Sequence, residues 1–371
     1  MLSSGFLLPE TEEKKMAGLN QKVESAAIIS RLQDLIKERI DDFLPEEYKG
    51  SEIKFMDVTK NNDEKLHAVI IKPEGQNVTP TIYLEQFVEA LSNNSITEDE
   101  ILSNISRTYA ANVKGGESLG DRVLRSFDEG FDTIRDSVIM QVVNTGLNSE
   151  TLKDSPHREV EDLSIVYRIF VEKADDGSIG SIRIQNAMLD TWGIKEEDLY
   201  SAAVENTPRL FPTKVDTMEN VLSSVMGSPF QIPEGDTTTR ALYIITNEQK
   251  VNGAAVPFYD KATIDSLCDQ MGGSMFLIPS SIHEMIAMPA GESNTIDDPV
   301  NTIAEMIVEI NNTEVSDSEI LGTKPYHYDK ETGFMLAEKF EKLNMEKTKE
   351  KVMENAINKA IELNSSPSLA I

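Results

Sequence analysis

Cysteine and long apolar runs are the two features that this sequence most clearly lacks. Its single cysteine, Cys268, excludes a disulfide bond within the chain and is typical of a reducing compartment. Its apolar runs all fall short of the roughly 18 residues that a helix needs to cross a bilayer. The first residues contain neither the basic segment nor the long apolar segment of a secretory signal. We therefore expect a cytoplasmic protein with no membrane partner.

Histidine is also scarce, which bears on metal sites. The chain has four histidines, and His283-Glu284 lacks the second histidine of an H-E-x-x-H zinc motif. The glycine pair Gly115-Gly116 matches neither of the common glycine-rich phosphate-binding motifs, and no strong strand precedes it. The sequence therefore predicts no metal, no cofactor and no nucleotide site.

Basic residues are greatly outnumbered. The chain has 35 Lys and Arg against 64 Asp and Glu, which gives a net charge of −29. Such a charge repels phosphate groups, so we expect no direct binding of nucleic acid. The simpler interpretation of the acidity is solubility. The alternative is a decoy, in which an acidic surface occupies the basic groove of a nucleic-acid-binding protein.

The apolar pattern changes repeatedly between the helical period and the strand period, which is typical of an α+β fold. Helical spacing predicts helices over residues 22–44, 83–91, 97–109, 123–143, 187–191, 195–206, 219–226, 298–311 and 338–363. Thr97 and Glu100 are placed to form a capping box at the start of the third of these helices. Short β-branched and aromatic runs predict strands over residues 53–58, 66–71, 164–171, 179–185, 213–218, 326–329 and 334–335. The expected fold is an antiparallel sheet built from ββα modules, with helices packed on it and an extended C-terminal helix.

The chain is organised around residues 240–289, its densest apolar stretch. Asp260 is placed as the N-cap of a helix whose apolar residues follow at helical spacing, and Gly272 is placed to end that helix. Pro279-Ser280-Ser281 is expected to break the strand that follows. The stretch then becomes a ββαββ unit, with strands over residues 242–245, 254–259, 275–278 and 282–288.

Linker signals and charge divide the sequence into five parts. The expected parts are a disordered leader over 1–20, a helix, hairpin and helix module over 21–112, a linker over 113–120, a central α+β domain over 121–336, and an exposed helix and tail over 337–371. The alternation of Lys and Glu in the last part indicates a helix stabilised by i,i+4 pairs.

Two segments carry a resemblance to a known family. One is YIITNEQKVNGAAVPFY, followed by a helix that ends in MGG and by FLIPSSIHE; the other is TWGIKEEDLYSAAVENT over 191–207. Both resemble an uncharacterised family found mainly in gut Firmicutes, some of whose members lie near mobile elements. The similarity extends from about Ile28 to about Phe334. It implies a cytoplasmic bacterial α+β protein and no known activity.

The candidate binding site is a polar cluster in the central stretch. Four of its residues crowd one tight turn, and two more belong to a loop that we expect at the same edge of the sheet: Ser280, Ser281, His283, Glu284, Asn247 and Asn252. The simplest interpretation is a structural turn, in which hydroxyls cap the backbone and His283 bonds to the neighbouring loop. Contact with a ligand or partner is the second interpretation. Catalysis by Ser281 and His283 is the third, although no G-x-S-x-G motif is present.

The function that follows is a non-enzymatic binding or adaptor protein with an unknown protein partner and no assigned catalytic residue. A small hydrolase that uses the Ser281/His283 turn and the acidic decoy remain as alternatives. An adaptor requires an exposed apolar patch beside the polar cluster, whereas a hydrolase requires Ser281 and His283 in one concave pocket. The sequence specifies neither the partner nor the oligomeric state.

Overall fold

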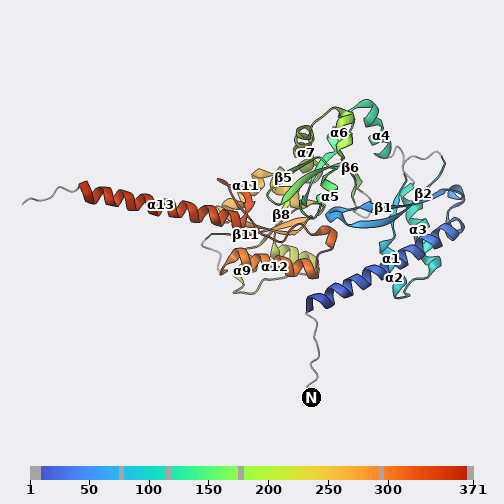
Figure 1. The fold of residues 1–371 in the computed structure, drawn as a ribbon, viewed down its shortest axis with the longest axis horizontal. Helices are drawn as coiled ribbons and strands as arrows, with labels where there is room; N and C mark the ends of the chain where they lie inside the picture. Colours follow the sequence, from blue (N-terminus) through green and yellow to red (C-terminus); the bar gives the residue numbers. More distant parts are fainter. Residues whose placement is uncertain (1–9, 75–78, 114–118, 174–178, 292–295, 366–371) are drawn as a thin grey trace, which may run out of the picture. The chain divides into compact units, whose positions relative to one another are not determined.

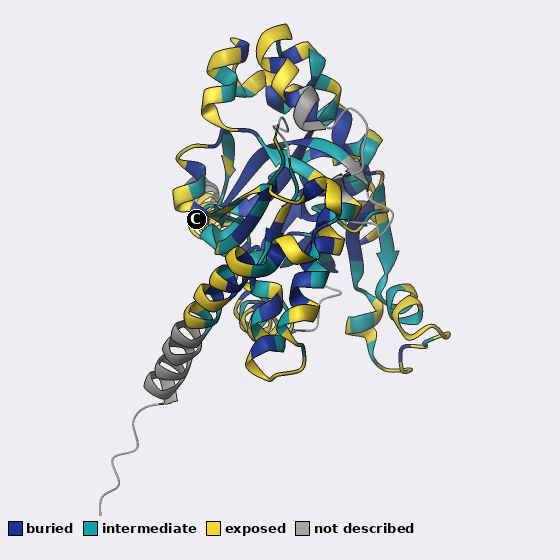
Figure 2. Ribbon diagram, turned by 90° about the vertical axis from the view of Figure 1, so that its right-hand side faces the viewer, coloured by how far each residue is buried: buried dark blue, intermediate teal, exposed yellow. Residues whose placement is uncertain are grey.

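The computed structural model describes residues 10–74, 79–113, 119–173, 179–291 and 296–365. The chain divides into two compact units, Met1–Asp128 and Glu129–Ile371, each with its own antiparallel sheet structure (Figure 1). Within each unit buried residues gather along the strands, and the outward faces of the helices carry most exposed residues (Figure 2). The predicted leader over 1–20 and linker over 113–120 lie partly outside the described residues, so the division into five parts stays a prediction.

The first unit is a three-stranded sheet with helices packed on it. Its elements are α1 (Glu10–Phe43), β1 (Glu52–Thr59), β2 (Lys65–Lys72), β3 (Thr81–Tyr83), α2 (Val88–Ser92), α3 (Glu98–Val113) and α4 (Leu119–Glu129). Strand order is β1-β2-β3. The helix expected from residue 22 begins at Glu10, since most of residues 10–21 have high helix propensity.

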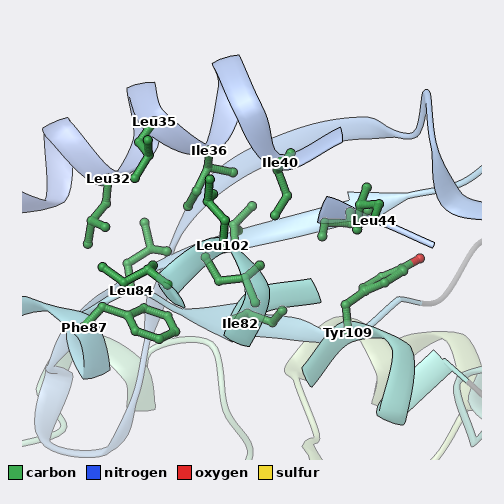
Figure 3. Close-up of a cluster of buried hydrophobic side chains, with 14 of the residues drawn as sticks. Leu32, Leu35, Ile36, Ile40, Leu44, Ile82, Leu84, Phe87, Leu102 and Tyr109 are labelled. Carbon is green, nitrogen blue, oxygen red and sulfur yellow. The ribbon is translucent and has the colours of Figure 1, made fainter. Parts of the chain in front are cut away.

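The core of the first unit forms where α1 faces α3. Leu32, Ile36 and Ile40 project from α1 at helical spacing toward Leu102 of α3 (Figure 3). The predicted capping box begins α3: the Thr97 N–H donates to Glu100 Oε2 at 2.8 Å, and the Glu100 N–H donates to Thr97 Oγ1 at 3.3 Å. The apolar pattern and the cap therefore predicted this core correctly.

The second unit carries the larger sheet and the candidate site. Its elements are β4 (Val138–Asn144), α5 (Ser149–Leu152), β5 (His157–Val160), β6 (Leu163–Lys173), β7 (Ile179–Arg183), α6 (Asn186–Trp192), α7 (Glu196–Leu210), β8 (Thr213–Thr217), α8 (Met218–Met226), α9 (Thr237–Arg240), β9 (Tyr243–Asn247), α10 (Val256–Tyr259), α11 (Lys261–Gln270), β10 (Ser274–Ser281), β11 (Glu284–Pro289), α12 (Pro299–Thr313), β12 (Tyr326–Asp329), β13 (Gly333–Leu336) and α13 (Ala337–Ser365).

Two sheets organise these elements. One has four strands, with β6 paired to β4, β5 and β7; the other has six strands in the order β13-β12-β10-β11-β9-β8. On one face of the six-stranded sheet, Phe276 and Met288 pack against Val300, Ile303 and Ile307 of α12. The α+β fold, its antiparallel sheets and its C-terminal helix are as the sequence predicted.

Two predictions of helix were wrong. Residues 123–143 are not one helix, because Gly130 leaves helical geometry at φ 93° and Val138–Asn144 is strand β4. The first six residues of β4 are all buried and all but Gln141 are apolar, and such a run fits either period. Residues 83–91 are helical only from Val88, after a short 3₁₀ turn, because Thr81–Tyr83 pairs with β2 as a third strand.

Two predictions in the central stretch were also wrong. Residues 254–259 form a 3₁₀ turn and α10, not a strand; Pro257 occupies the first turn of α10, where its missing N–H has no cost. Pro279-Ser280-Ser281 does not end the strand, since β10 continues to Ser281 through a shift in register. A bulge of this kind tolerates proline. The remaining elements of the stretch, including the Asp260 cap at 3.2 Å from the Thr263 N–H, are as predicted.

Candidate functional site

The structure brings the six candidate residues to one end of the six-stranded sheet. Asn247 ends β9, and Asn252 lies in the loop that follows. Ser280 and Ser281 end β10, and Glu284 begins β11. His283 lies in the turn between them. The loop and the turn therefore lie together at one end of the sheet, where the Asn252 N–H contacts the His283 ring.

Asn247 shapes the loop. Its side chain is 1 % exposed, and it binds Val251 twice: Nδ2 donates to the Val251 carbonyl at 2.7 Å, and Oδ1 accepts from the Val251 N–H at 3.3 Å. Lys250 and Asn252 both have φ of 56°, in the left-handed region. Asparagine adopts this region readily, whereas lysine seldom does. Asn247 thus holds a tightly wound loop in place.

His283 joins the loop to the turn. Its Nδ1 accepts a hydrogen bond from the Asn252 N–H at 3.1 Å, and its Nε2 lies 3.3 Å from Glu319 Oε1. A neutral ring that accepts at Nδ1 carries its proton on Nε2, where it donates to the Glu319 carboxylate. Both ring nitrogens are therefore occupied by structural partners.

The two serines bond locally. Ser281 Oγ accepts from the His283 backbone N–H at 3.0 Å, and Ser280 Oγ donates to Glu284 Oε1 at 3.1 Å. A serine nucleophile requires its hydroxyl on a free ring nitrogen of its base. Here the Ser281 hydroxyl contacts the backbone N–H of His283 and not its ring. This geometry favours the structural interpretation of the turn over the hydrolase interpretation.

Gly253 is essential to the site for a reason that the sequence analysis missed. A Cβ at this position would lie 2.4 Å from Thr246 Oγ1 and 2.5 Å from the His283 carbonyl oxygen. Thr246 Oγ1 itself donates to that carbonyl at 2.8 Å. The Asn252-Gly253 dipeptide indicates a turn, but only Asn252 has a positive φ; Gly253 allows close approach instead.

Beside the turn lies a small pocket of about 60 Å³, which is room for a few water molecules or one small side-chain group. Its walls come from the edge strand β8, from α8, from β9, from the loop and from β11. They are Lys214, Asp216, Val221, Ser224, Ile244, Thr246, Lys250 and Glu284. Only Glu284 of the six candidate residues lines it, and neither Ser281 nor His283 does.

The charges of the pocket are balanced. Lys214 Nζ lies 3.5 Å from Asp216 Oδ2, and Lys250 and Glu284 add one charge of each sign. Burial acts to raise the pKa of Asp216, but hydrogen bonds from Asn220 and from the Thr217 N–H bring this pKa below its usual value. Asp216 is therefore held ionised. The pocket suits a group that both donates and accepts hydrogen bonds.

An exposed apolar patch adjoins the pocket on α8. The same helix that contributes Val221 and Ser224 to the wall ends in Val225 and Met226, which are 76 % and 60 % exposed. Single exposed apolar side chains are common on protein surfaces, whereas neighbouring exposed apolar side chains mark a surface suited to contact a partner. The sequence signal was the apolar run at 225–226, which the sequence analysis used only to place a helix.

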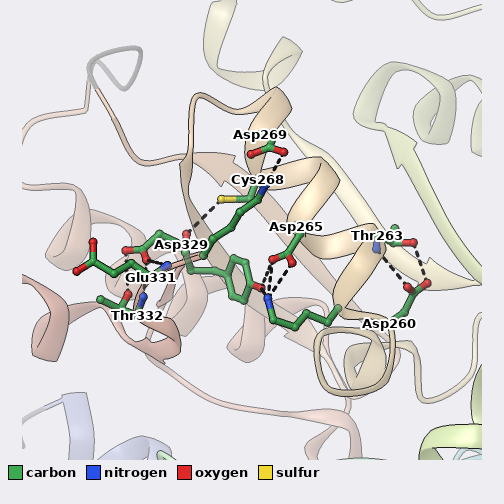
Figure 4. A network of polar contacts seen from close by, with 11 residues as sticks. Asp260, Thr263, Asp265, Cys268, Asp269, Asp329, Glu331 and Thr332 are labelled. Atoms are coloured by element: carbon green, nitrogen blue, oxygen red, sulfur yellow. Dashed lines mark hydrogen bonds and ion pairs between the residues drawn. The ribbon is translucent and has the colours of Figure 1, made fainter.

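A second serine–histidine pair lies elsewhere on the same sheet. Ser274 Oγ and His327 Nε2 are 2.8 Å apart, and His327 Nδ1 lies 3.8 Å from Asp329 Oδ2. Both oxygens of Asp329 instead hold the following turn, accepting from the N–H groups of Glu331 and Thr332 and from the Thr332 hydroxyl (Figure 4). A serine, a histidine and an aspartate are thus close, but the hydrogen bond between histidine and aspartate that a catalytic triad requires is missing.

The surroundings of His327 also differ from those of a catalytic base. Its ring is 1 % exposed and stacks on Phe340 with centroids 3.3 Å apart. Burial lowers its pKa to about 4, although Asp329 acts in the opposite direction. A general base works best with a pKa near the operating pH. We therefore interpret Ser274, His327 and Asp329 as a buried structural group.

Other reactive groups in the second unit have structural contacts. Cys268 is buried in α11, with Sγ 3.8 Å from the Tyr328 carbonyl oxygen (Figure 4), and burial raises the pKa of its thiol. Such a thiol is a poor nucleophile. The described ranges contain no group of three or more His, Cys, Asp or Glu placed to bind a metal ion. None of the helices in the described part of the chain is long and apolar enough to cross a membrane.

Comparisons with known proteins add a family but no activity. Neither the curated proteins nor the solved structures contain a match to the chain. The model of a family of unknown function, DUF5688, matches residues 29–330. This range covers most of the chain and includes every candidate residue. The chain therefore belongs to the family of unknown function DUF5688.

Proposed function

We propose that the chain is a non-enzymatic adaptor of the cytoplasm, and that the pocket and the adjoining Val225/Met226 patch form its binding surface for a protein partner. The observation that carries this proposal is the exposed apolar pair at the end of α8, the helix that also lines a pocket of balanced charge. An adaptor requires that combination. The buried thiol of Cys268 supports a reducing compartment.

The position of the surface suggests how a partner binds. β8 is the last strand in its sheet, so one of its edges has no neighbouring strand among the described residues. Lys214 and Asp216 of this strand line the pocket. An extended peptide that pairs with a sheet edge gains main-chain hydrogen bonds and places alternate side chains into adjacent pockets. We propose that the partner presents a short extended segment, with one polar side chain in the pocket and one apolar side chain on α8.

The hydrolase and decoy alternatives have less support. Neither Ser281 nor His283 lines the pocket, and both ring nitrogens of His283 have other partners. The decoy rests on the net charge of −29 alone.

A pull-down from bacterial lysate with the tagged full-length protein tests the proposal. The informative variant is Val225→Glu, which places a charge on the proposed surface. Met306→Glu is its matched control, since Met306 is also exposed but belongs to α12. We expect one stoichiometric protein to bind wild type and Met306→Glu and to be lost with Val225→Glu. Equal capture by both variants, or capture of no protein, contradicts the proposed surface.

A further inference from the structure

Among the residues whose side chains the structure describes, the C-terminal helix α13 contacts the rest of the second unit through its beginning. Ala337 is fully buried, and its N–H donates to the Pro325 carbonyl at 3.0 Å. Phe340 stacks on His327. Farther along α13, Lys347 forms an ion pair with Glu331 at 3.5 Å. All residues of 342–357 are exposed, and the helix extends away from the second unit (Figure 1).

This exposed segment carries an apolar stripe, which we define as Met345, Val352, Met353, Ala356 and Ile357. Four of the five, all except Ala356, are large side chains that are more than half exposed. Spacings of seven and four residues place these side chains on one side of a helix. Lys349 lies within the stripe, where its methylene stem can cover apolar surface while its ammonium group stays in water. Most of the stability of a helix in a protein comes from packing its apolar face, so burying the stripe would stabilise α13.

The charge of α13 identifies what buries the stripe. The helix contains six glutamates and six lysines, so the whole net charge of −29 is carried by the rest of the chain. Two copies of so acidic a protein repel each other wherever their acidic surfaces meet. Two copies do not repel each other along α13, because each presents lysines to the glutamates of the other. The neutral helix is therefore the part of the chain best suited to contact a second copy.

We propose that α13 is a self-association helix, and that the stripe packs against the same stripe of a second copy of this chain. This interface is separate from the proposed partner surface on α8, which a dimer would present twice. Two linked sites bind more tightly to a partner that also carries two copies of the recognised segment.

Light scattering of the full-length protein over a range of concentrations tests the association. We expect a mass of twice 41.3 kDa, and we expect this mass to persist at high salt because the contact is apolar at its centre. Val352→Glu with Ile357→Glu should return the mass to that of one chain. The control is Asn344→Glu with Asn355→Glu, which adds the same charge to the opposite side of α13 and should leave the dimer intact. A monomer at every concentration, or a dimer that survives Val352→Glu with Ile357→Glu, overturns the proposal.

Disulfide trapping locates the contact independently. Because the natural cysteine, Cys268, is buried, a cysteine introduced on α13 reports on α13 alone. Under mild oxidation we expect Val352→Cys to form a covalent dimer several-fold faster than Asn355→Cys. Equal rates for the two variants would show that the stripe is not the contact. Neither result depends on the proposed partner surface.

Discussion

Two serine–histidine pairs lie on the same six-stranded sheet, and they differ in almost every physical respect. His283 is two residues from Ser281, its side chain is 30 % exposed, and its two nitrogens contact the loop and Glu319. His327 is 53 residues from Ser274, is 1 % exposed, and accepts or donates directly at the serine hydroxyl. Ser281 and His283 are close in sequence, and there the serine hydroxyl contacts the histidine backbone. In the other pair, the pairing of β10 with β12 brings the Ser274 hydroxyl to the His327 ring.

The comparison suggests that one histidine supports the core of the second unit and the other supports its surface. Trp192 allows this to be measured, since it is the only tryptophan and lies in the second unit. Its fluorescence during unfolding reports on that unit alone. Substitutions of both histidines, a substitution in the loop and a change of pH test this contrast.

His327→Ala should have the largest effect. It removes a fully buried ring that stacks on Phe340 and leaves Ser274 Oγ without its partner. Loss of a buried side chain of this size costs about 3 kcal/mol in the free energy of unfolding. Chemical denaturation followed by Trp192 fluorescence measures the loss. A change below about 1 kcal/mol would contradict the assignment of His327 to the core.

Acid should destabilise the second unit through the same residue. Burial holds the pKa of His327 at about 4, compared with 6.5 in the unfolded chain. The unfolded chain therefore binds a proton first as the pH falls, and stability is lost progressively from pH 6.5 down to about 4. The loss approaches about 3 kcal/mol. His327→Phe should flatten this part of the stability curve; an unchanged curve would assign the effect to other groups.

Gly253→Ala should have an intermediate effect. The new methyl group would meet the Thr246 side chain and the His283 carbonyl at less than 3 Å, so the loop must move away from the turn. Overpacking of this kind costs about 2 kcal/mol. Hydrogen exchange should show faster exchange at Asn252 and Ala254, which bond to the turn. Gly235→Ala, in open space, is the control and should leave exchange unchanged.

His283→Ala should have the smallest effect. It leaves the Asn252 N–H without its acceptor, but water can replace the ring at a partly exposed site. We expect a loss of about 1 kcal/mol or less, with His283→Asn retaining more stability than His283→Ala if its amide oxygen accepts from Asn252. A loss as large as that of His327→Ala would remove the distinction between the two pairs.

The sequence was sufficient for features that depend on neighbours along the chain. The apolar spacing of Leu32, Ile36 and Ile40, the Thr97–Glu100 cap and the Asp260 cap were all predicted, because each is determined within a few residues. It also predicted that His283 would bond to a neighbouring loop, and the structure identifies the bonded residue as Asn252.

Features that depend on which strands pair in the folded protein could not be predicted from the sequence. The fully buried run of β4 fits either a helix or a strand, and only its pairing with β6 determines which forms. The Ser274–His327 contact requires knowing that β10 and β12 are neighbours. The pocket likewise combines the consecutive elements β8 and α8 with β11, which follows them only after several other elements.

The strand order has a consequence for incomplete chains. β10 lies in the middle of the six-stranded sheet, but its neighbour β12 is among the last strands along the chain. A nascent or truncated polypeptide that ends before Tyr326 leaves one edge of β10, with Met275, Phe276 and Leu277, unpaired. Such an open apolar edge promotes aggregation. A chain cut after Phe340 retains the complete sheet. Cellular quality control should therefore degrade chains that stop before residue 326 and spare chains that stop after residue 340.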